Sequence, residues 1–219
     1  MSKIISKEIY PGVLHLNFPN QYWVTDTFMR LQEFYESPLE SIQGHYFTKE
    51  EYQDIYVKNY GKFDYHFRWS GFNVPGHIVM KFFKLYTGKG ALSKKESMLY
   101  SSILSKIDVR RAFYLIGTYD NIDINHEVAH ALYYLNEDYR NSMNILLNHY
   151  ANTKLFVNIR SSLLKIGYSK KFLRDETQAY LSTGDYRDLV NYKLQPKDLD
   201  VIDKFKTVFS GYSKLLRRV

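Results

Sequence analysis

The sequence contains no cysteine among its 219 residues. It also lacks any apolar run long enough to cross a bilayer, and its first seven residues, MSKIISK, lack the apolar core of a secretory signal peptide. The absence of cysteine excludes a disulfide framework and a cysteine nucleophile. The other two absences predict a cytoplasmic protein without a membrane span.

Positive charge is in moderate excess over negative charge, with a formal net charge of +7 and a pI near 9.2. The Lys and Arg residues are spread along the chain and form only short clusters, such as Lys170 with Lys171 and Arg217 with Arg218. A dispersed pattern of this kind is typical of a solvated basic face. Binding to nucleic acid is therefore possible but not indicated.

Apolar residues make up 45% of the chain, enough for a globular protein with its own core. We expect a single domain over residues 1–219. Residues 1–105 form an aromatic-rich N-terminal part to which the sequence assigns no role. Residues 106–219 form the second part, which carries the motifs described next.

An HExxH motif, HEVAH, occupies residues 126–130. On a helix, His126 and His130 are about one turn apart on the same face, so both can bind one tetrahedral metal ion, for which zinc (Zn²⁺) is the usual choice. Glu127 lies beside His126, where it can reach a metal-bound water and act as a general base without binding the metal. This arrangement is typical of a zinc hydrolase.

The surroundings of the motif are also those of a helix. Val128, Ala131 and Leu132 fall on the opposite face from the histidines, so one face can enter a core while the other lines a cleft. Residues 112–119 read as a buried strand that precedes the helix, and Asn121 or Asp123 can serve as its N-cap. Chance occurrence of the two histidines, in a protein that binds no metal, is the alternative.

A catalytic zinc site needs a third protein ligand. Residues 171–181 read as a helix capped by Ser169, and projection places Glu176 within its apolar stripe while Asp175 and Gln178 point away. Since a carboxylate at an apolar interface is costly unless it is paired or bound to a cation, Glu176 is the leading candidate. His149 is a competing ligand, and a salt bridge from Glu176 to a Lys or Arg is the alternative role.

These features resemble the gluzincin type of zinc metallopeptidase, in which HExxH is followed on a later helix by a ligand glutamate in an ExxA context, here residues 176–179. The resemblance covers residues 112–183. It implies that His126, His130 and Glu176 bind zinc and that Glu127 is the base. It also implies a zincin-like catalytic core in residues 106–219, which makes them the metal-binding part of the chain. The expected helices and strands predict a mostly helical α+β fold, with a small sheet beside the HExxH helix.

The chain departs from this pattern at Tyr180, where some gluzincins carry an aspartate, and in the 45 residues that separate His130 from Glu176. The metzincin pattern is excluded, because Asn136 stands where its third histidine would be. In the mechanism that the resemblance implies, Tyr180 is our first choice as the donor to the oxyanion, with Tyr133 or Tyr134 behind it. The substrate would be a peptide or protein, which could pair with the edge of the strand at 112–119.

Further elements are predicted away from the motif. Strand 13–18, helices 25–36, 139–150, 154–165 and 196–216, and capping boxes at Thr48 and Ser93 are expected, with a turn-rich segment at 68–76. The helix over 196–216 is expected to face inward with Leu199, Ile202, Phe205, Val208 and Phe209. Two other functions are open: an inactive zinc-binding protein of zincin fold, and a metal-free basic interaction module.

Overall fold

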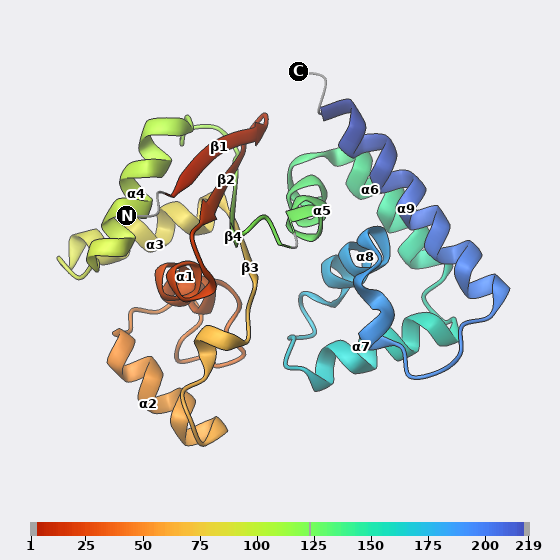
Figure 1. Ribbon diagram of the computed structural model, residues 1–219, viewed down its shortest axis with the longest axis horizontal. Helices are drawn as coiled ribbons and strands as arrows, with labels where there is room; N and C mark the ends of the chain where they lie inside the picture. The colour runs from red at the N-terminus through yellow and green to blue at the C-terminus, as the bar shows by residue number, and fades with distance from the viewer. Residues whose placement is uncertain (1–3, 123, 217–219) are drawn as a thin grey trace. The chain divides into compact units, whose positions relative to one another are not determined.

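The computed structural model describes residues 4–122 and 124–216 of the chain. The chain divides into two compact units, Met1–Ile124 (unit 1) and Asn125–Val219 (unit 2), which we describe one at a time (Figure 1). The described residues contain nine α-helices and one four-stranded sheet, so the predicted α+β, mostly helical class is confirmed. None of these helices is both long enough and apolar enough to cross a membrane.

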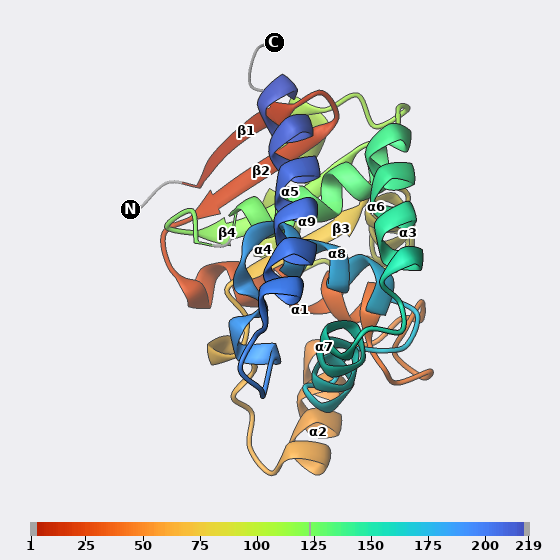
Figure 2. The ribbon, with the colours of Figure 1, turned by 90° about the vertical axis from the view of Figure 1, so that its right-hand side faces the viewer.

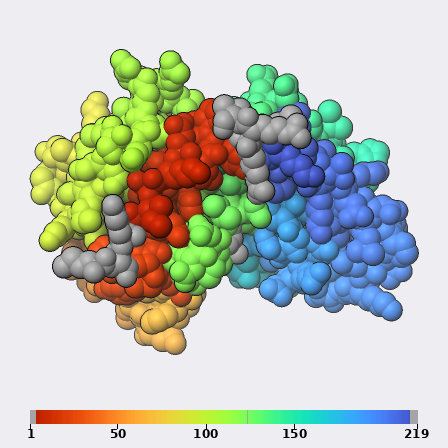
Figure 3. Space-filling model, turned by 45° about the horizontal axis from the view of Figure 1, so that its top comes forward, coloured from red at the N-terminus to blue at the C-terminus, as the bar shows by residue number. Residues whose placement is uncertain are grey.

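Unit 1 contains the sheet. Its strands are β1 (Ile5–Tyr10), β2 (Val13–Phe18), β3 (Gly71–Pro75) and β4 (Tyr114–Tyr119), in the order β1-β2-β4-β3. β2 and β4 are parallel, and the two outer pairings are antiparallel. Half of the side chains of the outer strand β1 are exposed, and red atoms of this part of the chain lie at the surface of the unit in Figure 3.

Two predictions about this sheet are wrong. β4, which contains most of the segment 112–119, is paired on both sides by β2 and β3, so it has no free edge for a substrate strand. The segment 68–76 is not merely a turn, because β3 runs through it. Phe72 and Val74 alternate into the core there, and Pro75 stands at the last position of an outer strand, where its missing N–H is tolerated.

Four helices accompany the sheet in unit 1: α1 (Gln21–Glu36), α2 (Lys49–Tyr60), α3 (Gly76–Gly88) and α4 (Lys94–Lys106), with a short 3-10 helix at Tyr65–Phe67. The capping boxes predicted at Thr48 and Ser93 are confirmed. α1 packs closely on β4, because a Cβ added at Gly117 would overlap the ring of Phe28. Glycine at this position is what allows the close approach.

A buried ion pair ties α1 to α4. Arg30 and Glu96 are both almost fully buried, and Arg30 Nε donates to Glu96 Oε1 at 2.8 Å. Arg30 also donates to the carbonyl of Ala91 and lies over the ring of Tyr86. The guanidinium thus has an ion-pair partner, a backbone acceptor and an aromatic ring around it, as a buried charge requires.

Unit 2 is helical over its described residues. Its helices are α5 (Ile124–Leu135), α6 (Glu137–His149), α7 (Lys154–Lys165), α8 (Leu173–Thr183) and α9 (Pro196–Leu216), with a 3-10 helix η2 at Asp185–Leu189. α9 packs along both α6 and α8, and α7 packs against α8 and η2 (Figure 2). The helices predicted at 139–150, 154–165 and 196–216 are confirmed.

The predicted inward face of α9 needs one correction. Ile202, Phe205 and Phe209 are buried as expected, but Leu199 is 47% exposed and Val201 is buried in its place. The buried face of α9 therefore keeps its predicted centre, while Val208 at its margin is only half-buried.

Candidate metal centre

Helix α5 carries the HExxH motif as predicted. The chain leaves β4 through Asp120 and Asn121, both with positive φ, and α5 begins at Ile124. Asn121 is therefore too far from the helix to cap it, and the alternative cap, Asp123, lies outside the described residues. His130 and Glu127 are buried on this helix, and the side chain of His126 is 11% exposed.

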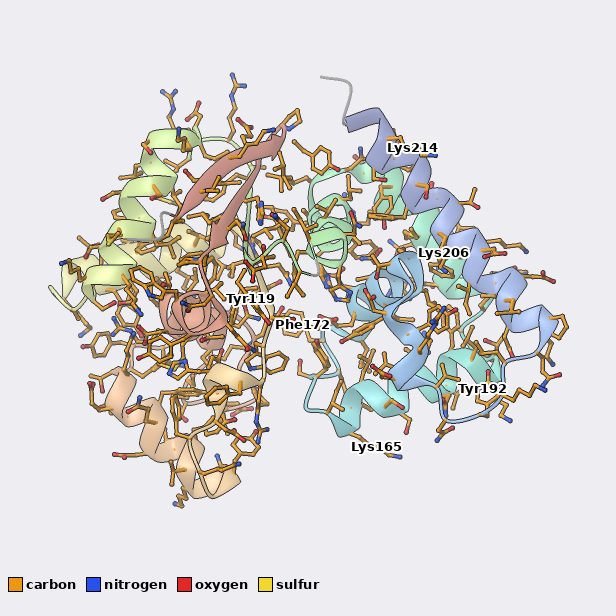
Figure 4. The ribbon with its side chains drawn as sticks, viewed as in Figure 1. Tyr119, Lys165, Phe172, Tyr192, Lys206 and Lys214 are labelled. Atoms are coloured by element: carbon orange, nitrogen blue, oxygen red, sulfur yellow. The ribbon has the colours of Figure 1, made fainter. Side chains whose placement is uncertain are left out.

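Helix α8 supplies the third residue of the site. The predicted cap at Ser169 is wrong, because α8 begins at Leu173 and follows Phe172, which is labelled in Figure 4. Glu176 is buried as the apolar stripe predicted. Thr177 and Gln178 are buried too, so the prediction that Gln178 points away from the core is wrong. α8 packs against α6, α7, α9 and η2, which leaves little of its surface to solvent.

The two histidines and Glu176 direct three atoms at one point. His126 Nε2 and His130 Nε2 are 3.2 Å apart, and each is 3.7 Å from Glu176 Oε2. Four ligands at about 2.0–2.1 Å from a tetrahedral zinc ion are about 3.3–3.4 Å from one another. The three separations lie close to that value, so this donor set fits zinc without rearrangement of the helices.

Glu176 Oε2 is buried and has no hydrogen-bond partner among the described residues. A buried carboxylate oxygen without a donor is costly, and a cation between it and the two imidazoles would remove that cost. Among the described residues, the side chains that could hold a metal ion together are those of His126, His130 and Glu176.

A carboxylate also faces the other nitrogen of each imidazole. His130 Nδ1 lies 3.0 Å from Asp175 Oδ1, and His126 Nδ1 lies 3.5 Å from Asp185 Oδ2. A carboxylate beside Nδ1 favours the tautomer with its proton on that nitrogen, which leaves the Nε2 lone pair for a metal, as is common around protein metal sites. Three acceptor atoms then converge, and a positive charge is needed to stabilise them.

Electrostatics support the same conclusion. Burial lowers the pKa of His126, but Asp185 and Glu176 outweigh burial and raise that pKa to about 9. Burial also opposes protonation of His130, yet Asp175 and Glu176 raise its pKa well above the ordinary value. Around both rings, the surrounding carboxylates favour positive charge strongly enough to overcome desolvation.

Sequence reasoning missed the roles of Asp175 and Asp185. Asp175 was expected to point to the polar side of its helix, and it does remain partly exposed while it reaches His130. Asp185 follows Gly184, whose left-handed conformation ends α8 and turns the chain back toward His126. A Gly-Asp pair just after a predicted helix was the signal available. The interaction with His126 lowers the pKa of Asp185 despite its partial burial, with smaller contributions from Thr183 and from Lys206, which is labelled in Figure 4.

Tyr180 lies beside the metal-binding group. Its ring centroid is 4.6 Å from that of His126, and its hydroxyl is 3.5 Å from the hydroxyl of Tyr168. Burial, Glu176 and Glu127 raise the pKa of Tyr180 to about 12, so the hydroxyl keeps its proton near neutral pH. Tyr133, an alternative donor, already donates to Asn144 Oδ1 at 2.7 Å.

The remaining predicted residues are also located. Glu127 is buried, and its charge raises the pKa of both histidines and of Tyr180, which puts it in electrostatic range of the whole group. His149, the competing third ligand, is exposed at the end of α6, where its ring packs against Tyr150. It does not belong to the metal-binding group.

Comparison of the chain with protein-family models, curated proteins and solved structures finds no match.

Proposed function

We propose that the protein is a zinc-dependent metallopeptidase of gluzincin type, with a zincin-like catalytic core. The observation that carries the proposal is the convergence of His126 Nε2, His130 Nε2 and Glu176 Oε2 within unit 2. Two imidazoles and one carboxylate are a ligand set used by catalytic zinc in peptidases, and they leave the fourth position for water or substrate.

A bound zinc ion supplies Lewis acidity, which acidifies a water molecule and polarises the carbonyl of the scissile bond. Glu127 then acts as the general base. It accepts a proton from the attacking water and later gives a proton to the leaving amine, so that water and an amide become an acid and an amine. Glu127 is buried and its charge acts on both histidines, and these two observations support this role.

Tyr180 is the proposed donor to the oxyanion. Its hydroxyl stays protonated at neutral pH and its ring contacts that of His126, so a hydrogen bond from it can stabilise charge that develops on the carbonyl oxygen. Asp175 and Asp185 hold the imidazole protons on Nδ1, which keeps both Nε2 atoms available as ligands. The substrate is a peptide or protein.

The test is hydrolysis of a mixture of unstructured peptides by the zinc-loaded protein, with products identified by mass spectrometry. Glu127→Gln removes the base and no ligand, so it is expected to retain zinc and to lose turnover. Glu137→Gln, at the exposed first residue of α6, is the matched control and should remain active. Equal turnover by Glu127→Gln and wild type would contradict the mechanism, and a zinc-loaded wild type that cleaves no peptide would contradict the proposed activity.

A further inference from the structure

Gln178 is a fully buried polar residue that connects three helices of unit 2. From α8 its amide nitrogen donates to Asp175 Oδ1 at 2.9 Å and lies 3.3 Å from the carbonyl oxygen of Ala129 on α5. Its amide oxygen accepts from the hydroxyl of Tyr139 on α6 at 2.8 Å. Gln178 and Tyr139 both have no exposed surface.

The chemistry of the partners fixes the orientation of this amide. A carboxylate oxygen and a backbone carbonyl only accept, so the group that faces them is the NH2. A flipped amide would place its oxygen against two acceptors and its NH2 against the hydroxyl of Tyr139. The two acceptors therefore orient Gln178, Tyr139 holds its amide oxygen with a hydrogen bond, and the amide nitrogen presents a donor to Asp175.

Asp175 Oδ1 is the shared atom of this network. It accepts from Gln178 and lies 3.0 Å from Nδ1 of His130, whose Nε2 is one of the three converging atoms. Asp175 is itself partly exposed, with 26% of its side chain accessible. A partly exposed carboxylate has other rotamers available, and the bond from buried Gln178 selects the one that faces His130.

We infer that Gln178, anchored by its hydrogen bond from Tyr139, is a positioning residue for the metal site that acts through Asp175 on His130. This inference rests on the proposed zinc site. Residues that orient a ligand in this way change metal affinity without touching the metal, typically by about 10- to 100-fold.

The experiment measures zinc affinity by competition with a chromogenic chelator for wild type, Gln178→Met and Tyr139→Phe. Gln178→Met keeps the length of the side chain and removes all three of its hydrogen bonds, so a loss of about 10- to 100-fold is expected. Tyr139→Phe removes one hydroxyl and leaves the amide in place, so its loss should be smaller. Thr177→Val is the matched control, because this buried neighbour on α8 bonds only to a carbonyl of its own helix.

A second readout separates positioning from a general effect on packing. If Gln178 acts through Asp175, the variant Asp175→Asn and the double variant with Gln178→Met should have affinities within about twofold of each other, since a coupled pair is not additive. The visible spectrum of the cobalt(II)-substituted protein should also shift in Gln178→Met and stay unchanged in Thr177→Val.

The outcomes are distinguishable. If wild type binds zinc and Gln178→Met binds it as tightly as Thr177→Val, the positioning role is contradicted while the metal site stands. Additive losses in the double variant would also contradict the role, even if Gln178→Met alone is weaker. If wild type itself binds no zinc, the proposed function fails and the inference fails with it. Tyr139→Phe keeps the test valid should Gln178→Met not fold.

Discussion

Asp185 Oδ2 and Nδ1 of His126 lie 3.5 Å apart, on the opposite side of the imidazole from Glu176. The contact joins η2 to α5 and places a half-exposed carboxylate behind a metal ligand. It gives this histidine the same kind of partner that Asp175 gives to His130.

Asp185→Asn should therefore weaken zinc binding. The amide has no charge to stabilise the imidazole, and we expect a loss of about tenfold, at the lower end of such effects because Asp185 is half exposed. Chelator competition measures it. Asp188→Asn, an exposed aspartate on the same 3-10 helix, is the control and should bind zinc as wild type does. Equal affinities for the two variants would show that Asp185 does not support His126.

Tyr180→Phe should lower kcat and leave zinc content unchanged. Loss of one donor to an oxyanion typically costs about 10²- to 10³-fold in kcat, with a smaller effect on KM. The measurement is steady-state hydrolysis of a peptide that wild type cleaves. Tyr133→Phe is the control, because the hydroxyl of Tyr133 already donates to Asn144. A Tyr180→Phe variant with the kcat of wild type would remove Tyr180 from the mechanism.

His15 should make unit 1 less stable in mild acid. Its buried ring contacts the hydroxyl of Thr118, and burial lowers its pKa to about 4 from 6.5. Between these two pH values the unfolded chain binds a proton at His15 that the folded unit excludes. The free energy of unfolding of unit 1 is therefore highest above pH 6.5 and decreases toward pH 4. The loss over that window should be about 1–3 kcal/mol.

Urea unfolding at several pH values, followed by tryptophan fluorescence in the presence of a chelator, measures this effect. Both tryptophans of the chain, Trp23 and Trp69, lie in unit 1, so the signal reports on that unit. His15→Gln should flatten the acid-dependent loss, while His45→Gln, at an exposed position, should not. Identical pH dependence in wild type and His15→Gln would contradict the assignment.

Glu96→Gln should destabilise unit 1 by about 3–5 kcal/mol, because it leaves the buried charge of Arg30 without its partner. It also places an amide where the carboxylate accepts from the backbone N–H of Ser93. The same fluorescence-detected unfolding gives the free energy, and Glu40→Gln, at an exposed position, should change it by less than about 0.5 kcal/mol. A loss from Glu96→Gln no larger than that of the control would contradict the role of the pair.

Part of the site could be predicted because it depends on local helical geometry. The spacing of His126 and His130 determines their shared face, and the apolar stripe around Glu176 determines its burial; neither needs knowledge of distant residues. The structure brings these three side chains together as the sequence indicated.

The rest depends on contacts that no local pattern encodes. Whether β4 is an inner or an outer strand depends on β3, which lies about 40 residues earlier in a segment whose Gly and Pro content suggested a turn. The position of Asp185 depends on the left-handed turn at Gly184, and the burial of Gln178 depends on its partners on α5 and α6, Ala129 and Tyr139. Tertiary packing decided each of these.

The central claim is that His126, His130 and Glu176 hold one zinc ion. Elemental mass spectrometry of protein purified without a histidine tag tests it most directly, with wild type compared with Glu176→Ala. The account predicts close to one zinc per chain in wild type and a clear loss in the variant. A folded wild type that contains no zinc and takes up none when zinc is added would contradict the account.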